Sequence, residues 1–269
     1  MLTRDFLPAV EAAREAGLNH FEMAGGARFQ SLYFYCNEDA FDMMDAVRTA
    51  AGSDVKLQSL ARGVNVVGLE SQSRDVIQAH ARLFRRHGVD RIRNFDALND
   101  VNNLIDSGRF IAEAGAEHEV TVTMMGLPPG SGESHTSEFY IGVLRRILDA
   151  DIPYSSVCFK DASGTTPPAI VYETVNKARA LLGDSAWIVF HSHESAGICA
   201  AQYHAAVQAG ADQVDTSLAP ISGGSSQPDV LTIWQTFRGG EYQLDIDPIK
   251  VRAAEESLKA ALADYEFPP

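Results

Sequence analysis

Two histidines with metal-binding spacing, His191 and His193, follow the apolar run W-I-V-F at 187–190. The run has the composition of a buried strand, and alternate side chains of a strand share a face, so both imidazoles point the same way. Neutral imidazole nitrogens are common ligands of divalent metals. The spacing therefore predicts a metal site at the end of this strand. The alternative is a pair of polar residues at a strand exit whose ring nitrogens bond to loop backbone.

A lysine, Lys160, stands at the end of another predicted strand, 153–159. The parity of the strand directs Val157 and Phe159 toward covering helices and Lys160 toward the inside. There a lysine could form a Schiff base, could be carbamylated by carbon dioxide to give an anionic metal ligand, or could pair with structural carboxylates. The residue alone leaves the three roles open.

These two strands belong to a regular alternation of strands and helices along the chain. Seven strands are predicted, at 20–23, 56–61, 90–95, 119–125, 153–159, 187–190 and 211–214. The helices are predicted at 3–16, 38–51, 73–87, 100–115, 137–150, 167–182, 196–209, 228–238 and 248–263, with a glycine- and proline-rich loop at 126–136. No linker interrupts this pattern, which predicts one α/β domain over 1–269, with a core of about 6–240 and a C-terminal helical segment at 241–269.

The order of these elements favours a TIM (β/α)8 barrel that lacks its first strand. One helix precedes the first of seven strands, and polar residues follow the strands, where a barrel keeps its active-site loops. Those residues are Arg62, Asp96, Lys160, His191 and Thr216. A doubly wound open sheet is the alternative, but it needs an early G-x-G-x-x-G turn, which A-G-G-A at 24–27 does not match.

Composition excludes several classes of partner. The 22 basic and 36 acidic residues give a net charge of −14, which would repel nucleic acid and anionic membranes. No apolar run approaches the roughly 20 residues of a membrane span, and the N-terminus lacks the apolar core of a signal peptide, so we expect a soluble, cytoplasmic protein. Cys36, Cys158 and Cys199 have no C-x-x-C spacing and are expected to be reduced thiols.

Five segments carry motifs in a fixed order. They are L-A-R-G-V-N-V-V-G at 60–68, R-I-R-N-F-D-A-L-N at 91–99, C-F-K-D-A-S-G at 158–164, F-H-S-H-E at 190–194, and V-D-T at 214–216 followed by S-G-G-S-S-Q-P at 222–228. Over about 6–240 the chain thus resembles the carboxyltransferase domain shared by pyruvate carboxylase, the oxaloacetate decarboxylase alpha subunit and transcarboxylase, which are metal-dependent TIM barrels similar to HMG-CoA lyase.

The resemblance implies a biotin-dependent carboxyltransferase that acts on a small 2-oxo acid, pyruvate or oxaloacetate. Carbamylated Lys160, His191 and His193 would hold zinc, manganese or cobalt, which would act as a Lewis acid and stabilise an enolate. Arg62 would hold the substrate carboxylate through a bidentate contact, and Ser225 would relay a proton between substrate and biotin.

The resemblance also implies substrate contacts at Gly25, Gly26, Gly63, Asn65, Asp96 and Thr216. Two of these assignments have alternatives in the residues themselves. Arg62 could instead pair with a carboxylate at the barrel rim such as Asp96. The glycine pair 25–26 could instead serve only a tight turn.

Two departures from the family qualify the resemblance. The family's barrel opens with a strand ending in R-D-x-H-Q-S, whose aspartate is the fourth metal ligand, and this sequence starts just after that point. It also shows no A/V-M-K-M site for biotin attachment. Biotin is therefore expected on a separate biotin carboxyl carrier protein, beside a biotin carboxylase subunit, with this chain forming a homodimer or larger assembly.

Two other functions stay open: a metal-dependent acyl-CoA lyase or 2-oxo-acid aldolase, and a degenerate barrel that only binds a ligand or assembles a carboxylase complex. The count of seven strands also leaves two sheet edges, at 20–23 and 211–215. We expect those edges to pair directly, to receive a segment from another subunit, or to leave the chain marginally stable.

Overall fold

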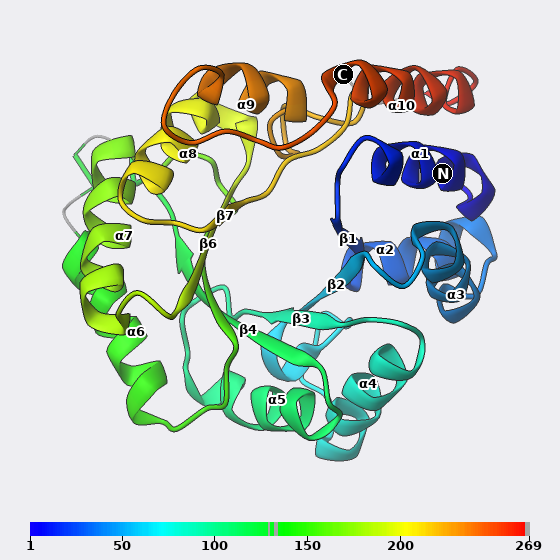
Figure 1. Cartoon of the computed structure of the whole chain (residues 1–269). Helices are drawn as coiled ribbons and strands as arrows, with labels where there is room; N and C mark the ends of the chain where they lie inside the picture. Colours follow the sequence, from blue (N-terminus) through cyan, green and yellow to red (C-terminus); the bar gives the residue numbers. More distant parts are fainter. Residues whose placement is uncertain (129, 132–133, 267–269) are drawn as a thin grey trace.

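The computed structural model describes residues 1–128, 130–131 and 134–266 and contains one sheet of seven parallel strands in the order β1 to β7 (Figure 1). The strands are β1 (His20–Ala24), β2 (Lys56–Ala61), β3 (Arg91–Asn94), β4 (Glu117–Met124), β5 (Ser156–Asp161), β6 (Trp187–Ser192) and β7 (Gln213–Val214). Residues 129, 132 and 133 of the predicted loop at 126–136, and 267–269 of the predicted C-terminal segment, lie outside the described residues.

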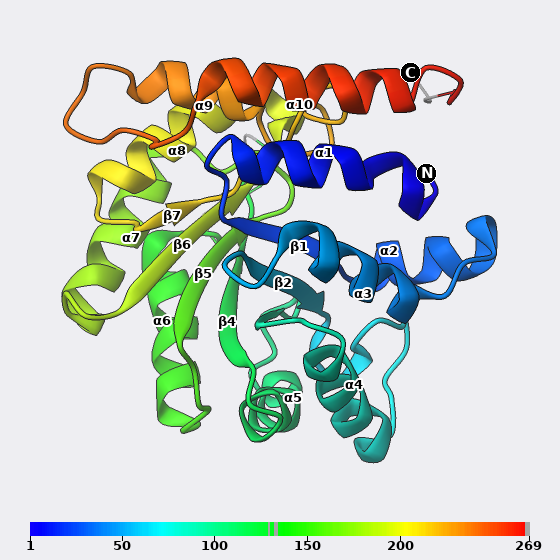
Figure 2. The ribbon, with the colours of Figure 1, turned by 45° about the vertical axis from the view of Figure 1, so that its right-hand side comes forward.

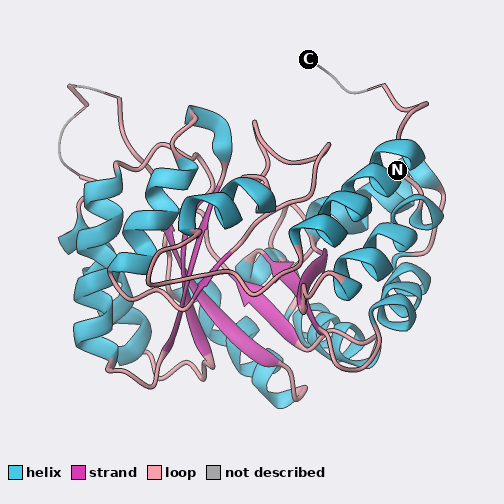
Figure 3. Ribbon diagram, turned by 45° about the horizontal axis from the view of Figure 1, so that its top comes forward, coloured by secondary structure: helices cyan, strands magenta, loops and turns pink. Residues whose placement is uncertain are grey.

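Helices surround the sheet, and most were predicted from periodicity (Figure 3). They are α1 (Thr3–Glu15), α2 (Gly26–Ser31), the π-helical η1 (Leu32–Cys36), α3 (Ala40–Ala51), η2 (Gly63–Asn65), α4 (Arg74–Arg86), α5 (Asn102–Glu113), α6 (Ser137–Asp149), α7 (Pro168–Leu182), η3 (Glu194–Ala196), α8 (Cys199–Gln208), α9 (Val230–Phe237) and α10 (Pro248–Ala261). The α2 and η1 helices were not predicted.

The sheet curves like the wall of a barrel but stays open between its first and last strands (Figure 1). Every neighbouring pair is parallel, and no ladder joins β1 to β7 among the described residues. This is the arrangement expected of an eightfold barrel short of one strand, and direct pairing of the two edges was the wrong alternative. An open doubly wound sheet is likewise ruled out, because the strand order of such a sheet reverses, whereas here the strands follow sequence order from β1 to β7.

The apolar core is divided between two halves of the sheet. One cluster packs β4, β5 and β6 against α5 to α9 and includes the fully buried Phe159 and Phe190. The other packs β1, β2 and β3 against α2 to α5 and includes Leu57 and Phe84. Alternate strand residues thus pack outward on helices, which leaves the other alternation for the inside of the barrel.

Arg48, near the end of α3, binds the residues that lead into the amino-terminal ends of β2 and β3; we call this set of bonds a clamp. Its Nη1 donates to the carbonyls of Gly52 and Val55, each at 2.8 Å. Its Nη2 donates to the Gly88 carbonyl at 2.6 Å and pairs with Asp90. One guanidinium therefore joins a helix end to the starts of two strands.

Arg179 makes the same set of bonds at the other end of the sheet. Its Nη1 donates to the carbonyls of Gly183 at 3.0 Å and Ala186 at 2.6 Å. Its Nη2 donates to the Gly210 carbonyl at 2.7 Å and pairs with Asp212 at 2.6 Å. The acceptors stand at the same offsets, four and seven residues after each arginine, and glycine and aspartate recur two residues apart. The chain thus repeats one clamp beneath β2–β3 and beneath β6–β7.

No helix within the described ranges is long and apolar enough to cross a membrane. Cys158 and Cys199 are buried and Cys36 is partly buried, and all three are free thiols, as the absence of C-x-x-C spacing predicted.

Candidate active site

The two histidines converge at the carboxyl end of β6. His191 is the fifth residue of the strand and His193 follows its end, and the two Nε2 atoms lie 3.1 Å apart. Two nitrogen ligands of one tetrahedral zinc, each about 2.0–2.1 Å from the metal, would be separated by about 3.3 Å. The observed separation fits either a shared cation or one hydrogen bond between the rings.

Asp215, just after β7, sets the tautomer of His191. Its Oδ2 lies 2.8 Å from His191 Nδ1. Burial would raise the pKa of Asp215, but Arg93 and His191 hold it well below its usual range, so the carboxylate is ionised. An ionised carboxylate accepts a hydrogen bond from Nδ1–H, which leaves the lone pair on Nε2, the nitrogen that faces His193.

Arg93 of β3 is fully buried and connects this pair to the rest of the interior. Its guanidinium pairs with Asp215 at 2.6 Å, with Glu22 at 3.5 Å and, through Nε, with Glu119. Burial alone would lower the pKa of Arg93, but the surrounding carboxylates, Asp215 foremost, raise it. The inside of the barrel therefore holds charges that compensate one another.

Burial keeps the histidines neutral. Burial first, and the charge of Lys160 second, lower the pKa of His191 to about 3. The same two causes lower the pKa of His193. Neutral imidazole is the form that binds a metal.

Lys160 lies beside the histidines, as its strand parity predicted. It is in register with His191 on the neighbouring strand and only 6% exposed. Its Nζ stands 5.4 Å from the centre of the Phe95 ring, and burial and then the charge of Arg93 lower its pKa. Among the described residues no carboxylate pairs with Lys160, so the structural ion pair considered from the sequence is not formed.

Arg62 follows β2 and lines the main cavity of the molecule. Its Nη1 donates to the Val67 carbonyl at 3.2 Å and to the Gly68 carbonyl at 2.9 Å. A side chain at residue 26 would put its Cβ 2.5 Å from Arg62 Cζ, so the guanidinium packs directly against Gly26 and would have to shift to admit a larger residue. The alternative in which Arg62 pairs with Asp96 is not found in the described structure.

Three of the predicted contact residues make hydrogen bonds that hold the backbone around them: Asn65 and Asp96 within their own loops, and Gly63 to strand β3. Asn65 donates to the Leu69 carbonyl at 3.2 Å, and the Gly63 amide donates to Asn94 at 3.1 Å. Asp96 accepts hydrogen bonds from the backbone of Leu98 and Asp100, each at 2.9 Å, and from Asn103 at 2.8 Å. The structure therefore gives these residues a local role and does not test their contact with a substrate.

The loop at 222–228 is hydrogen-bonded to the residues that directly follow His193. The Glu194 amide donates to the Ser226 carbonyl at 2.8 Å, and Ser195 donates to the Gly224 carbonyl at 3.4 Å. Gln227 brings its Nε2 to 3.4 Å from His191 Nε2. Ser225 lies between Gly224 and Ser226 in this loop and is exposed.

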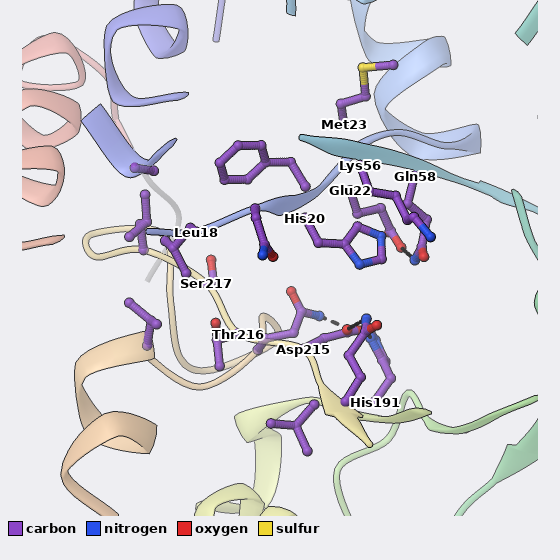
Figure 4. A pocket seen from close by; sticks show the side chains of 18 of the residues that line it. Leu18, His20, Glu22, Met23, Lys56, Gln58, His191, Asp215, Thr216 and Ser217 are labelled. Carbon is purple, nitrogen blue, oxygen red and sulfur yellow. Dashed lines mark hydrogen bonds and ion pairs between the residues drawn. The ribbon is translucent and has the colours of Figure 1, made fainter. Parts of the chain in front are cut away.

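A cavity of about 1400 Å³ runs along the open side of the barrel (Figure 4). His20 and Glu22 form one wall, and His191, Asp215 and Thr216 form the wall across from them. Gly25 and Gly26 also line this cavity. The predicted residues His191, Arg62, Thr216, Gly25 and Gly26 thus share one space.

Sequence reasoning missed Arg93, Asp215 and Gln227 as parts of the site. Asp215 and Gln227 lie inside motifs that the sequence had shown, and the parity of R-I-R-N at 91–94 directs Arg93 inward. Parity indicates a face but not a partner across the barrel, so the contacts themselves could not be predicted from the sequence.

The side chains that usually bind metals in proteins do not form a complete ligand set at the two histidines. Within the part of the chain that the structure describes, no group of three or more histidine, cysteine, aspartate or glutamate side chains is placed to hold a metal. Of two carboxylates that could replace the family's aspartate, Asp5 accepts from the Leu2 amide at 2.8 Å and from Tyr265, away from the histidines. Glu22 lines the cavity, where it pairs with Arg93 and accepts from Gln58 at 2.9 Å.

Known proteins resemble this chain closely. It is 31% identical over 247 residues to a pyruvate carboxylase subunit of Methanocaldococcus jannaschii, a match that covers 92% of this chain and 42% of that protein. It is 28% identical to the 2-oxoglutarate carboxylase large subunit of Hydrogenobacter thermophilus, with coverage of 98% and 39%. It is 25% identical to the methylmalonyl-CoA carboxyltransferase 5S subunit of Propionibacterium freudenreichii, with coverage of 99% and 51%. The chain therefore spans about half the length of these relatives or less, and no protein-family model matches it.

Solved structures give the same result. The carboxyl transferase domain of Rhizobium etli pyruvate carboxylase, solved with oxamate and biotin, superposes with a TM-score of 0.90 at 28% identity, covering 100% of this chain and 46% of that one. The fold thus matches that of a carboxyl transferase domain barrel. The chain is homologous to the carboxyltransferase domain of pyruvate carboxylase and to the corresponding subunits of related carboxylases.

Proposed function

We propose that this chain is the carboxyltransferase part of a biotin-dependent enzyme that moves a carboxyl group between carboxybiotin and a small 2-oxo acid such as pyruvate or oxaloacetate. The observation that supports this most is the match of the whole chain to a carboxyl transferase domain whose structure was solved with oxamate and biotin. Each of the five motifs recognised in the sequence includes the carboxyl end of a strand, β2, β3, β5, β6 or β7.

His191, His193 and Lys160 would hold a divalent metal. The 3.1 Å separation of the two Nε2 atoms and the Asp215 bond behind His191 fit a metal with histidine ligands. A metal there would supply Lewis-acid polarisation of the keto oxygen.

Lys160 would join the histidines after carbamylation. Burial and the charge of Arg93 lower its pKa, which makes the neutral amine easier to reach, and the amine nitrogen would form a bond to the carbon of carbon dioxide and release one proton. The product carries one negative charge and oxygen donors. Such a group suits a site flanked by buried Arg93.

Arg62 and Ser225 would handle the substrate. Both bonds of Arg62 to its own loop use Nη1, so among the described residues Nη2 keeps its donors for a carboxylate. Ser225 would move a proton between the substrate methyl group and biotin through its hydroxyl oxygen. Gly63, Asn65, Asp96 and Thr216 remain candidate contacts of the substrate.

Biotin would arrive on a separate carrier protein, and a biotin carboxylase subunit would load it. The relatives named as subunits are consistent with such a division of labour. We propose that the assembled enzyme works in the cytoplasm and contains two or more copies of this chain.

The first test is the replacement of Arg62 by lysine. Loss of the bidentate contact should cost about 2–3 kcal/mol, so kcat/KM for the 2-oxo acid should fall roughly a hundredfold in the reconstituted system. Arg74→Lys, at an arginine whose side chain is 70% exposed, is the matched control and should change nothing. An unaltered kcat/KM in Arg62→Lys would remove Arg62 from the site.

Avidin separates this function from the lyase or aldolase alternative. Because only carboxyl transfer needs biotin, avidin should abolish turnover of oxaloacetate by the reconstituted system. Turnover that persists with avidin present would favour the lyase or aldolase.

A further inference from the structure

Helix α8 packs against β6 and β7, the strands whose ends carry His191 and Asp215 (Figure 2). Two neighbouring residues of this helix, Gln202 and Tyr203, are fully buried. The proposed metal chemistry gives neither of them a role. Their polar atoms nevertheless bond to the strand ends on which the residues of the proposed site stand.

Tyr203 joins the backbone of the two histidines to that of Asp215. Its hydroxyl accepts a hydrogen bond from the Ser192 amide at 3.3 Å and lies within bonding distance of two carbonyls, that of Ser192 at 3.2 Å and that of Asp215. Ser192 stands between His191 and His193 in the chain. Burial raises the pKa of Tyr203, so the hydroxyl keeps the proton that it donates.

Gln202 holds the same residue from the other side. Its Oε1 accepts a hydrogen bond from the Ser192 hydroxyl at 2.5 Å, and its Nε2 donates to Asp161 at 3.0 Å. Asp161 follows Lys160 and is the last residue of β5. Gln202 therefore fixes the end of β6 to β5, whereas Tyr203 fixes it to the residue that follows β7.

Burial makes these bonds hard to replace. The side chains of Asp161, Ser192, Gln202 and Tyr203 are all fully buried. Water cannot take the place of a bond that a substitution removes there, so the strand ends would have to shift to find new partners. Groups that bind one metal must be held to within about 0.5 Å of their working positions. A shift at Ser192 would therefore alter the geometry of the histidines.

We propose that Tyr203 is a positioning residue for the histidine site. Its hydroxyl sets the separation between the backbone of His191 and that of Asp215, and so holds the carboxylate within reach of His191 Nδ1. The inference rests on the proposed function, because it concerns the residues proposed to hold the metal. Tyr203 itself touches neither the metal nor the substrate.

Two phenylalanine variants form a matched pair. Tyr203→Phe removes the hydroxyl and keeps the ring, whose centre lies 5.8 Å from that of Phe190. Tyr140→Phe is the control, because Tyr140 is as deeply buried and its hydroxyl bonds to the Met125 amide at 3.0 Å and to the Met125 carbonyl at 2.9 Å. Met125 is not a residue of the proposed site. Both variants should lose stability to a similar extent, which urea midpoints measure.

The first measurement needs no metal. Long-range proton–nitrogen NMR of the 269-residue chain with isotope-labelled histidine reports the tautomer of each imidazole, and the signals of His191 are those that His191→Gln lacks. We expect the Nδ1-protonated form in the unaltered chain and in Tyr140→Phe. Tyr203→Phe should show a mixture of both tautomers, because Asp215 is no longer held at Nδ1. A single unchanged tautomer in Tyr203→Phe would overturn the proposal.

The second measurement is titration calorimetry with zinc. The zinc affinity should fall about 10–100-fold in Tyr203→Phe, the range seen when the partner of a ligating histidine is disturbed, and should not change in Tyr140→Phe. Equal affinities in all three proteins, or an equal fall in both variants, would contradict the positioning role. If the unaltered chain binds no zinc while the tautomer still changes in Tyr203→Phe, the positioning of His191 stands and the proposed metal site fails.

Discussion

His191 uses its two ring nitrogens for different purposes. Nδ1 is held 2.8 Å from Asp215, and Nε2 faces His193 and Gln227. A partner that fixes the tautomer and raises the basicity of a ligating imidazole is worth about 10–100-fold in metal affinity. Asp215 is therefore a positioning residue for the proposed metal.

Replacement of Asp215 by asparagine should weaken the binding of a divalent metal by about 10–100-fold, because the amide cannot stabilise the Nδ1 proton as the carboxylate does. Titration calorimetry with zinc measures the change. Asp106→Asn, at a partly exposed aspartate that pairs with Arg74, is the control. An undiminished affinity in Asp215→Asn would separate Asp215 from the metal.

For single residues, the sequence predicted which face of a strand a side chain lies on better than it predicted which residues that side chain contacts. Strand parity correctly placed Lys160 beside His191 and Phe159 in the core. His191 and Asp215 lie at the ends of neighbouring strands, but Arg93 contacts Asp215 from β3, on another part of the sheet, and this contact depends on the curvature of the sheet. Local patterns carry no information about that curvature.

The clamps of Arg48 and Arg179 are the clearest feature at the scale of elements. Each arginine satisfies three backbone carbonyls and one aspartate, and no other type of side chain has donors spaced for four such acceptors. Lysine at either position should cost about 2–3 kcal/mol of unfolding free energy, because carbonyls would lose their partners.

Urea denaturation of Arg48→Lys and Arg179→Lys measures this cost, with Arg145→Lys at an exposed position as the control. The equivalence of the two clamps implies losses of similar size. If only one variant lost unfolding free energy, the two sets of bonds would not contribute equally to stability despite their similar geometry.

Periodicity predicted most helices, but it could not predict α2 and η1. The glycine pair at 25–26 is typical of a turn, and the helical segment that follows has no amphipathic pattern, since Tyr33, Phe34 and Tyr35 are 72%, 67% and 88% exposed. In the structure, Gly26 packs against the Arg62 guanidinium and Gly25 against Leu60. These contacts come from β2 and the loop that follows it, so a local pattern could not predict them.

Buried histidines should determine how the whole molecule responds to acid. Burial lowers the pKa of His80 to about 3 and that of His118 to about 4, from a value of 6.5 in the unfolded chain. The unfolded state therefore binds more protons below pH 6.5. The stability that each neutral histidine contributes is complete above that pH and is lost as the pH falls toward the folded pKa, by about 1.4 kcal/mol per unit.

His80 lies in α4 against Phe84, far from the proposed site, and tests this effect. Relative to the unaltered chain, His80→Leu should gain about 2 kcal/mol on going from about pH 7 to about pH 5, because one proton uptake is removed from the unfolded state. Urea midpoints at the two pH values give the difference. Parallel losses in both proteins would assign the acid sensitivity to other groups.

The two open edges of the sheet have a consequence for how ionic strength affects the protein. Exposed edges attract further strands, but each copy of the chain carries a net charge of −14, and like charges keep copies apart. The Debye length is about 30 Å in 0.01 M salt and about 8 Å at 0.15 M, so added salt removes this protection. Self-association, followed by light scattering, should therefore increase with salt, and an assembly that dissociates on adding salt would have to be held by charges rather than by the edges.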